Sequence, residues 1–176
     1  NDISFNKGDY LTNVYSEETA KVKKIYHNFQ QIENSNFSKN TVVEFSNDIS
    51  INKGDSLVHT NSKVIVSNAF KAKIIWCSKN NLVKNKRYEF KFHSRSIKGF
   101  VSKASSKNVN VNSISILQIE TELKNIISTV DKNYYLSQLC INDLETNETV
   151  GFGYVIQNLD KGQNVVYEQL QEFEKK

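Results

Sequence analysis

The feature that most constrains this sequence is an internal repeat. Residues 1–11 read NDISFNKGDYL and residues 47–57 read NDISINKGDSL, so the second copy begins 46 residues after the first. In each copy a short alternating apolar stretch precedes Asn-Lys-Gly-Asp and an apolar residue follows, which predicts a strand, a tight turn and a second strand. Gly8 and Gly54 supply the positive φ that such a turn requires. Two copies are too few for a solenoid, so we interpret them as equivalent corners of one small barrel.

Short alternating apolar segments recur along the rest of the chain, with turn residues between them. They predict about a dozen short strands and little helix, a pattern typical of antiparallel barrels. The expected strands cover residues 14–15, 20–26, 41–45, 57–59, 70–77, 88–92, 97–101, 114–119, 124–130, 136–141 and 150–156. We therefore expect an all-β chain of two consecutive antiparallel β-barrels, at residues 1–62 and 63–176.

The last part of the chain has a different pattern. Val166, Leu170 and Phe173 follow one another at the i, i+4, i+7 spacing of an amphipathic helix. We expect a short C-terminal helix or tail within residues 160–176.

Composition excludes several classes of protein. The net charge of +4 comes from Lys+Arg 23 against Asp+Glu 19, and only Arg87 and Arg95 are arginines. The lysines are spread along the chain without a long run, which indicates a solvated surface and not a nucleic-acid site. No stretch is long and apolar enough for a membrane-spanning helix, and no signal-peptide pattern opens the chain. The sequence contains no Met, so we expect it to be part of a longer protein.

The cysteines and histidines give no metal site. Cys77 and Cys140 lie in separate strand-like segments without a C-x-x-C spacing, so neither zinc nor a disulfide framework is predicted. A reducing, cytoplasmic location is the expectation that follows. None of the three histidines is at metal-ligand spacing to another His or Cys.

Two motifs resemble nucleotide-binding signatures. Asn6-Lys7-Gly8-Asp9 and Asn52-Lys53-Gly54-Asp55 match N-K-x-D, the guanine-reading motif of GTPases. The sequence holds no phosphate-binding G-x-x-x-x-G-K-[ST] segment, and Asn, Gly and Asp are common turn residues, so we interpret both copies as turns. Gly151-Phe152-Gly153 lies inside a strand and predicts a close backbone approach or a bulge. No catalytic, cofactor-binding or metal-binding residue is assigned to this chain.

One polar cluster stands out as a candidate contact site. His93, Ser94, Arg95 and Ser96 are predicted to occupy the turn between two strong strands. Loop tips on rigid flanks are frequent recognition sites, and an Arg side chain can bind a carboxylate or phosphate. An ordinary polar hairpin is the alternative interpretation.

The order of these segments resembles a known family. Lys7 to Leu11, Ala20 to Ile25 and Ile49 to His59 are similar to the second, barrel domain of elongation factor Tu-type GTPases. Within that superfamily the best fit is the large, GTP-binding subunit of bacterial sulfate adenylyltransferase. Further collinear similarities are Phe70 to Trp76, Leu82 to Phe92, Ser94-Arg95-Ser96, Val109 to Asn112, Leu123 to Ile126, Asn147 to Gly153 and Asn164 to Tyr167.

The resemblance implies a function for the parent protein. That family makes adenosine 5'-phosphosulfate and pyrophosphate from ATP and sulfate, driven by GTP hydrolysis, together with a smaller ATP-sulfurylase subunit. GTP and Mg²⁺ would bind in a GTPase domain that these 176 residues do not contain, and no catalytic residue carries over to this chain. The family also has a strand before the first Lys-Gly-Asp corner, so the resemblance implies that the first barrel, at residues 1–62, lacks its first strand here. In fused members of the family the tail leads into an adenylylsulfate kinase.

The expected partners of this chain are therefore its own GTPase domain, the smaller subunit and a fused or separate adenylylsulfate kinase. We expect the tip at His93, Ser94, Arg95 and Ser96, and the strand of Trp76, to be docking surfaces. Two alternatives stay open at this point. A translation factor of the same superfamily would use such barrels to bind aminoacyl-tRNA, and a stand-alone interaction module would have no enzyme attached.

Overall fold

The computed structural model describes residues 4–36, 40–60, 62, 64–93 and 95–160. Strands dominate these residues, and helix α1 (Tyr134–Ser137) is a single turn. The chain divides into two compact units between residues 63 and 64. The predicted tail helix at Val166, Leu170 and Phe173 lies outside the described residues. No helix in the described ranges has the length and apolarity to cross a membrane.

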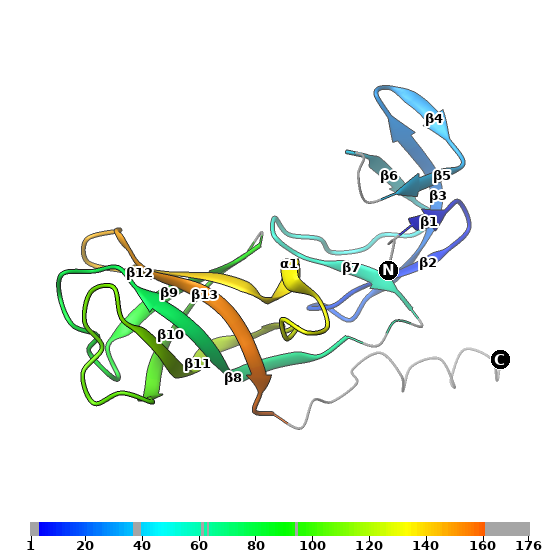
Figure 1. Ribbon diagram of the computed structural model, residues 1–176. Coiled ribbons are helices and arrows are strands. Elements are labelled where there is room, and N and C mark those ends of the chain that lie inside the picture. Colours follow the sequence, from blue (N-terminus) through cyan, green and yellow to red (C-terminus); the bar gives the residue numbers. More distant parts are fainter. Residues whose placement is uncertain (1–3, 37–39, 61, 63, 94, 161–176) are drawn as a thin grey trace. The chain divides into compact units, whose positions relative to one another are not determined.

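The second unit is a closed antiparallel barrel, with strand order β10-β11-β8-β13-β12-β9. Figure 1 shows β8 and β13 side by side in this barrel. Closure pairs every strand on both sides, so the barrel has no free sheet edge. Its strands are β8 (Val66–Trp76), β9 (Arg87–Phe92), β10 (Arg95–Ala104), β11 (Ile114–Ile126), β12 (Gln138–Asp143) and β13 (Thr149–Asn158).

Alternation along the strands fills this barrel with apolar side chains. In β9, Tyr88, Phe90 and Phe92 are buried while the residues between them face outward. Aromatic rings meet edge to face inside the barrel, Phe70 against Phe92 at 5.6 Å and Trp76 against Tyr88 at 6.1 Å between ring centroids. Full burial of each large side chain contributes roughly 1.5–3 kcal/mol, which makes this core the main source of stability of the unit.

The first unit has shorter strands and a smaller core. A five-stranded sheet has the order β4-β3-β2-β7 with β6 paired to β3, and β1 pairs separately with β5. Leu11, Val22 and Ile25 are its buried core cluster. Among the described residues these strands form two sheets and not one closed ring. The strands are β1 (Ser4–Asn6), β2 (Tyr10–Asn13), β3 (Thr19–His27), β4 (Gln30–Ile32), β5 (Asn34–Asn36), β6 (Val42–Phe45) and β7 (Leu57–His59).

Both copies of the repeat fold into the same turn. The Asp9 backbone N–H donates to the Asn6 carbonyl at 3.1 Å and the Asn6 N–H donates to the Asp9 carboxylate at 2.7 Å. The second copy repeats both bonds, at 3.0 and 2.9 Å, between its own Asn and Asp. Gly8 and Gly54 have φ values of 95° and 93°. These Asp side chains are therefore structural parts of turns, as the sequence predicts.

The two copies differ in the segment before the turn. Residues 4–6 form a strand in the first copy, whereas residues 49–51 form none in the second. Side chains bind the backbone there in place of a sheet neighbour. The Ser50 N–H donates to the Glu18 carboxylate at 2.6 Å, and the buried Asn13 side chain donates to the Ser50 carbonyl at 2.8 Å. The expected strand at this position was wrong for that reason.

The bounds of other strands also differ from those predicted from the sequence. Residues 14–15 and 127–130 are outside strands, and residues 136–137 belong to α1. Strands β4 and β5 were not predicted from the sequence, because their segments Gln30–Ile32 and Asn34–Asn36 are mostly polar. Such short polar segments show no apolar alternation, so only their pairing partners reveal them as strands.

Candidate docking site: a groove on the outer face of the second barrel

A row of mostly apolar side chains crosses the outer face of the second barrel. Strand register places Cys140 of β12 opposite Phe152 of β13, Phe152 opposite Ile75 of β8, and Ile75 opposite Ile114 of β11. Lys91 of β9 lies opposite Cys140 and ends the row. We call these five residues the outer row. Because paired residues of neighbouring strands face the same side of a sheet, the outer row is continuous across five strands.

The apolar members of the outer row are exposed because residues next to them along the same strands already face the core. Ile75 lies between Ile74 and Trp76, both buried, so its own side chain must point outward. Ile114 precedes the buried Ser115 and Leu117 and is 59% exposed. Phe152 is 45% exposed between Gly151 and Gly153. A Cβ at Gly153 would lie 2.0 Å from the Lys73 carbonyl oxygen, so glycine allows β13 to pack tightly against β8.

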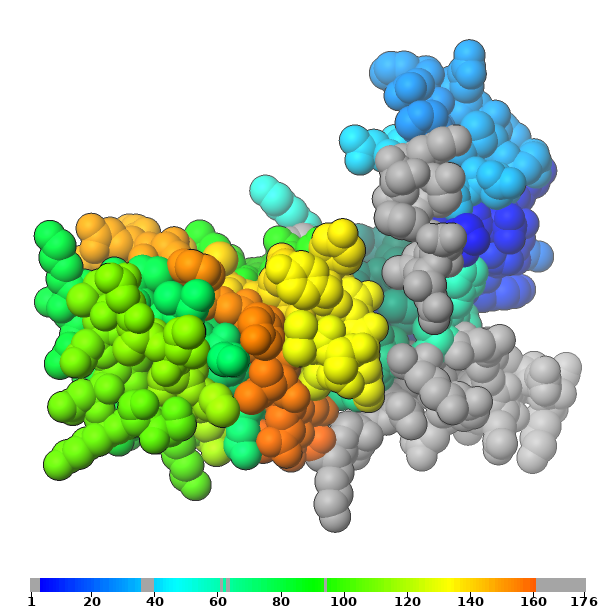
Figure 2. All heavy atoms as spheres, in the orientation of Figure 1, coloured from blue at the N-terminus to red at the C-terminus, as the bar shows by residue number. Residues whose placement is uncertain are grey.

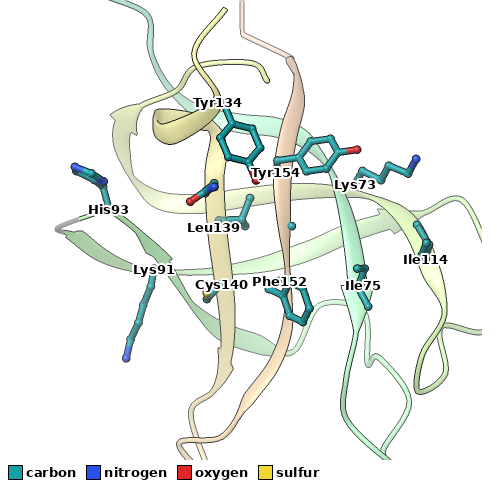
Figure 3. Close-up of a pocket in the computed structure, with 12 residues that line it drawn as sticks. Lys73, Ile75, Lys91, His93, Ile114, Tyr134, Leu139, Cys140, Phe152 and Tyr154 are labelled. Carbon is teal, nitrogen blue, oxygen red and sulfur yellow. The ribbon is translucent and has the colours of Figure 1, made fainter. Parts of the chain in front are cut away.

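The outer row forms the floor of an open groove of about 810 Å³. Figure 3 shows Cys140, Phe152 and Ile75 side by side, in that order, across the groove, with Tyr134 and Tyr154 on one side of them. Figure 2 shows this part of the surface from outside, with β13 as an orange band beside the yellow residues of α1. The groove is lined by Lys73, Ile75, Lys91, His93, Ile114, Tyr134, Gln138, Leu139, Cys140, Phe152, Gly153 and Tyr154.

Helix α1 holds Tyr134 on one side of the groove. The Asn133 side chain caps the helix by accepting the Leu136 backbone N–H at 3.0 Å. Tyr134 is 57% exposed and meets the ring of Tyr135 edge to face at 5.8 Å. The short capped turn thus places the Tyr134 ring at the groove, with the Tyr135 ring against it.

The charged lining of the groove is basic. Lys73, Lys91 and His93 line it, and no Asp or Glu does. The Lys91 ammonium lies 3.4 Å from the Glu89 carboxylate, which partly neutralises it. Lys73 makes no ion pair with a described residue and is exposed. The positive charge that a ligand would meet is therefore centred on Lys73.

Some of the residues singled out from the sequence come together at the groove. His93 has a φ of 36°, lies in the turn between β9 and β10, and lines the groove. Ser96 is exposed and lies opposite Lys91, beside the end of the outer row. Ser94 lies outside the described residues. These positions are compatible with docking at the tip, which stays a prediction.

Arg95 and Trp76 are placed differently from what the sequence suggested. Arg95 is half-buried, and its Nη1 atom is shielded from solvent, so it is not an exposed tip residue. Trp76 is 1% exposed, and its indole N–H donates to the Asn80 carbonyl at 2.8 Å. The Trp76 side chain thus belongs to the core, whereas Lys73 and Ile75 of the same strand are exposed and line the groove.

Most groove residues were missed by sequence analysis. The available signal was a run such as Ile74-Ile75-Trp76, in which three consecutive apolar residues cannot all face the core of a strand. Phe152 and Tyr154 gave a similar signal, since they alternate with glycines. Neither run reveals that its outward residues share one row, because that depends on register.

A cluster of titratable groups around Lys86 lies outside the groove lining. The Lys86 ammonium contacts Glu145 at 2.8 Å and Asp143 at 2.9 Å. These bonds raise the pKa of Lys86, the Glu145 bond most, and the Lys86 bond lowers the pKa of the Asp143 carboxyl. The described residues contain no group of three or more His, Cys, Asp or Glu arranged to hold a metal ion. An exposed apolar groove of this kind is suited to binding another molecule.

Comparisons with known proteins identify the relatives of the chain. No protein-family model matches the sequence. Sulfate adenylyltransferase subunit 1 of Saccharophagus degradans is 27% identical over 166 residues, or 88% of this chain. The same subunit of Teredinibacter turnerae is 26% identical over 86% of the chain, and that of Pseudoalteromonas atlantica 25% identical over 94%. The chain is homologous to sulfate adenylyltransferase subunit 1. It spans 35% to 38% of the length of these relatives.

Solved structures support the fold. Sup35 complexed with GDP has a TM-score of 0.79 and 18% sequence identity, over 89% of this chain and 42% of Sup35. Sup35 complexed with GMPPNP gives a TM-score of 0.78 at the same identity and coverage. The all-β, elongation factor Tu-like fold expected from the sequence is confirmed. At this identity the likeness concerns the fold alone.

Proposed function

We propose that this chain is the barrel region of a sulfate adenylyltransferase subunit 1-type protein. The observation that carries the proposal is the match to subunit 1 proteins across both compact units, over 86% to 94% of the chain. The parent protein would form adenosine 5'-phosphosulfate and pyrophosphate from ATP and sulfate, with GTP bound and hydrolysed in a separate domain. Its compartment would be the cytoplasm.

In this proposal the chain contributes docking surfaces and no catalytic group. The name subunit 1 implies a second subunit, which we take to be the smaller ATP-sulfurylase subunit. The outer-face groove is the surface of the second barrel best suited to it, because a contiguous exposed apolar patch is typical of interaction sites. For coupling to GTP, the contacts of the barrels must differ between the GTP and GDP states.

The test uses the full-length protein and the second subunit of the same organism. Pyrophosphate release from ATP and sulfate is measured for the mixed subunits with GTP, with GDP and without guanine nucleotide. We expect formation of adenosine 5'-phosphosulfate only when both subunits are present, and a marked increase with GTP. Adenylyl transfer that is independent of the full-length protein would refute the proposal.

A translation-factor function predicts a different result. Barrels that hold aminoacyl-tRNA should bind it with an affinity that falls steeply as salt rises, because phosphate contacts release counterions. Titration of the full-length protein with tRNA at low and moderate salt provides this comparison. Tight, strongly salt-dependent binding without adenylyl transfer would favour the translation factor. Binding to neither tRNA nor the second subunit would favour a stand-alone interaction module.

A further inference from the structure

The groove has a shape and a chemistry that restrict its occupant. The apolar part of its floor consists of Cys140, Phe152, Ile75 and Ile114, one from each of four neighbouring strands. Neighbouring strands are about 4.8 Å apart, so these side chains extend over roughly 14 Å. An α-helix rises about 1.5 Å per residue, and about ten helical residues would cover that length. The occupant is therefore a short segment lying across the strands.

Docking by strand addition is excluded at this surface. All six strands of the barrel are hydrogen-bonded on both sides, in the order β10-β11-β8-β13-β12-β9 with closure between β9 and β10. A partner strand needs an open sheet edge to pair with. An occupant must bind instead through its side chains, which favours an amphipathic segment with one apolar face.

The charges around the floor determine what flanks that apolar face. Lys73 lies two residues before Ile75 on the same face of β8. It is therefore next to the outer row, and its register partners are Tyr154 and Ile116. It has no ion-pair partner among the described residues, and no carboxylate lines the groove. A carboxylate on the occupant would complement the Lys73 ammonium, while a basic segment would meet like charge there.

A protein partner fits these features better than a nucleic acid. Lys73 and Lys91 are the lysines of the lining, Lys91 is already paired with Glu89, and no arginine lines the groove. A nucleic-acid site instead needs a cluster of basic side chains to neutralise consecutive phosphates. The exposed apolar floor would also gain little from contact with a phosphate backbone.

We propose that the groove binds a protein segment of about ten residues that presents apolar side chains to the outer row and a carboxylate to Lys73. The inference rests on the proposed docking function and names the chemistry of the partner at that site. Phe152 is the central apolar contact, because it lies between Cys140 and Ile75 in the row. Lys73 provides the charge selectivity.

The apolar contact is tested in the full-length protein, with the second subunit as the probe. Its affinity is measured by calorimetry for the wild type, Phe152→Ser and Leu123→Ser. Leu123 is a matched control, since it is 58% exposed on the same barrel but outside the groove. We expect Phe152→Ser to weaken binding by about 30-fold, as is typical of a central aromatic contact, and Leu123→Ser to change it less than about twofold. Thermal unfolding of each variant checks that the barrel is intact.

The charge contact is tested with Lys73→Glu and Lys73→Arg. Reversal of the charge should weaken binding about tenfold or more at low salt, with a smaller effect at high salt, while Arg keeps the affinity within about twofold. Equal affinity of the second subunit for the wild type and Lys73→Glu would contradict the proposal that the partner presents a carboxylate to Lys73.

The remaining outcomes separate this inference from the proposed function. If the wild type and Phe152→Ser bind the second subunit equally well and adenylyl transfer is intact, the groove is not the docking site but the proposed function stands. If the wild type does not bind the second subunit, both are overturned. Binding of tRNA that Phe152→Ser abolishes would overturn the assignment of a protein partner.

Discussion

At the scale of single residues, Phe29 has the least favourable conformation for its type. It lies with Asn28 in the turn between β3 and β4, and both have positive φ, 64° for Phe29 and 48° for Asn28. The side chain is fully exposed, so no packing compensates for the steric cost of a bulky residue in the left-handed region.

Replacement of Phe29 by Gly should therefore stabilise the first unit. Relief of the left-handed conformation outweighs the greater freedom of Gly in the unfolded chain, and we expect a gain of about 0.5–1 kcal/mol in the free energy of unfolding. Urea unfolding provides the measurement. Asn28→Gly is the control and should change stability less, because Asn tolerates this region well. A loss of stability in Phe29→Gly would contradict the argument.

A second residue-scale prediction concerns Gly153. An added Cβ would lie 2.0 Å from the Lys73 carbonyl oxygen, and that atom is part of the β8 backbone and cannot rotate away. We expect Gly153→Ala to destabilise the second unit by about 2–3 kcal/mol, by forcing β13 away from β8. The control is Gly151→Ala, whose nearest neighbour would be the Ile74 side chain at 3.0 Å. Equal thermal stabilities of the two variants would argue against a backbone clash.

At the scale of secondary-structure elements, the Lys86 ion pairs connect the start of β9 to the turn between β12 and β13. Asp143 accepts from the Lys86 ammonium, which lowers the pKa of the Asp143 carboxyl, and the Glu145 backbone N–H adds to this effect. The side chain of Asp143 is 16% exposed, whereas that of Glu145 is 77% exposed. Solvent screens the ion pair with Glu145 more strongly, so the ion pair with Asp143 should contribute more to the free energy of unfolding.

The pH dependence of unfolding follows from that shift. A carboxyl whose pKa is lowered by folding stabilises the protein fully above its unfolded pKa of about 3.9, and loses this contribution as pH falls through the lower folded value. We expect Asp143→Asn to be less stable than the wild type at pH 7, and the difference to shrink below about pH 4. Chemical unfolding at several pH values measures it. Glu145→Gln should show a smaller difference, and a difference that persists unchanged at low pH would contradict this assignment.

At the scale of the whole molecule, the two units differ in how much core they contain. The barrel encloses a large cluster that includes Phe70, Trp76 and Phe90, whereas Leu11, Val22 and Ile25 form the buried cluster of the first unit. Buried apolar area is the main stabilising contribution to folding, so the first unit should open at a lower free energy than the second.

Native-state hydrogen exchange can test this difference. We expect amides of β8 and β9 to exchange more slowly than those of β2 and β3, and thermal unfolding to proceed in two steps. The barrel variant Gly153→Ala should bring the two steps closer together and leave exchange in β3 unchanged. Uniform protection across both units, with one unfolding transition, would instead indicate a single cooperative structure.

The sequence predicted the features that depend on local chemistry. The Asn-Lys-Gly-Asp turns could be identified because Gly and Asp act within four residues, and the same hydrogen bonds occur in both copies. The strand of Tyr88, Phe90 and Phe92 could be identified from its strict alternation. The relatives could be inferred from short collinear motifs. In each case the information lies in neighbouring residues or in their order.

The candidate site depends on features that no local pattern contains. Cys140, Phe152, Ile75 and Ile114 come from four strands, and a shift of one residue in any register would turn one of them toward the core. Trp76 is buried in the core, whereas Ile75, its neighbour in the sequence, faces the groove. The sequence therefore determined the turns, most strands and the family resemblance. Only the tertiary structure decided which apolar residues remained at the surface, because a closed barrel can enclose one face of each strand and no more.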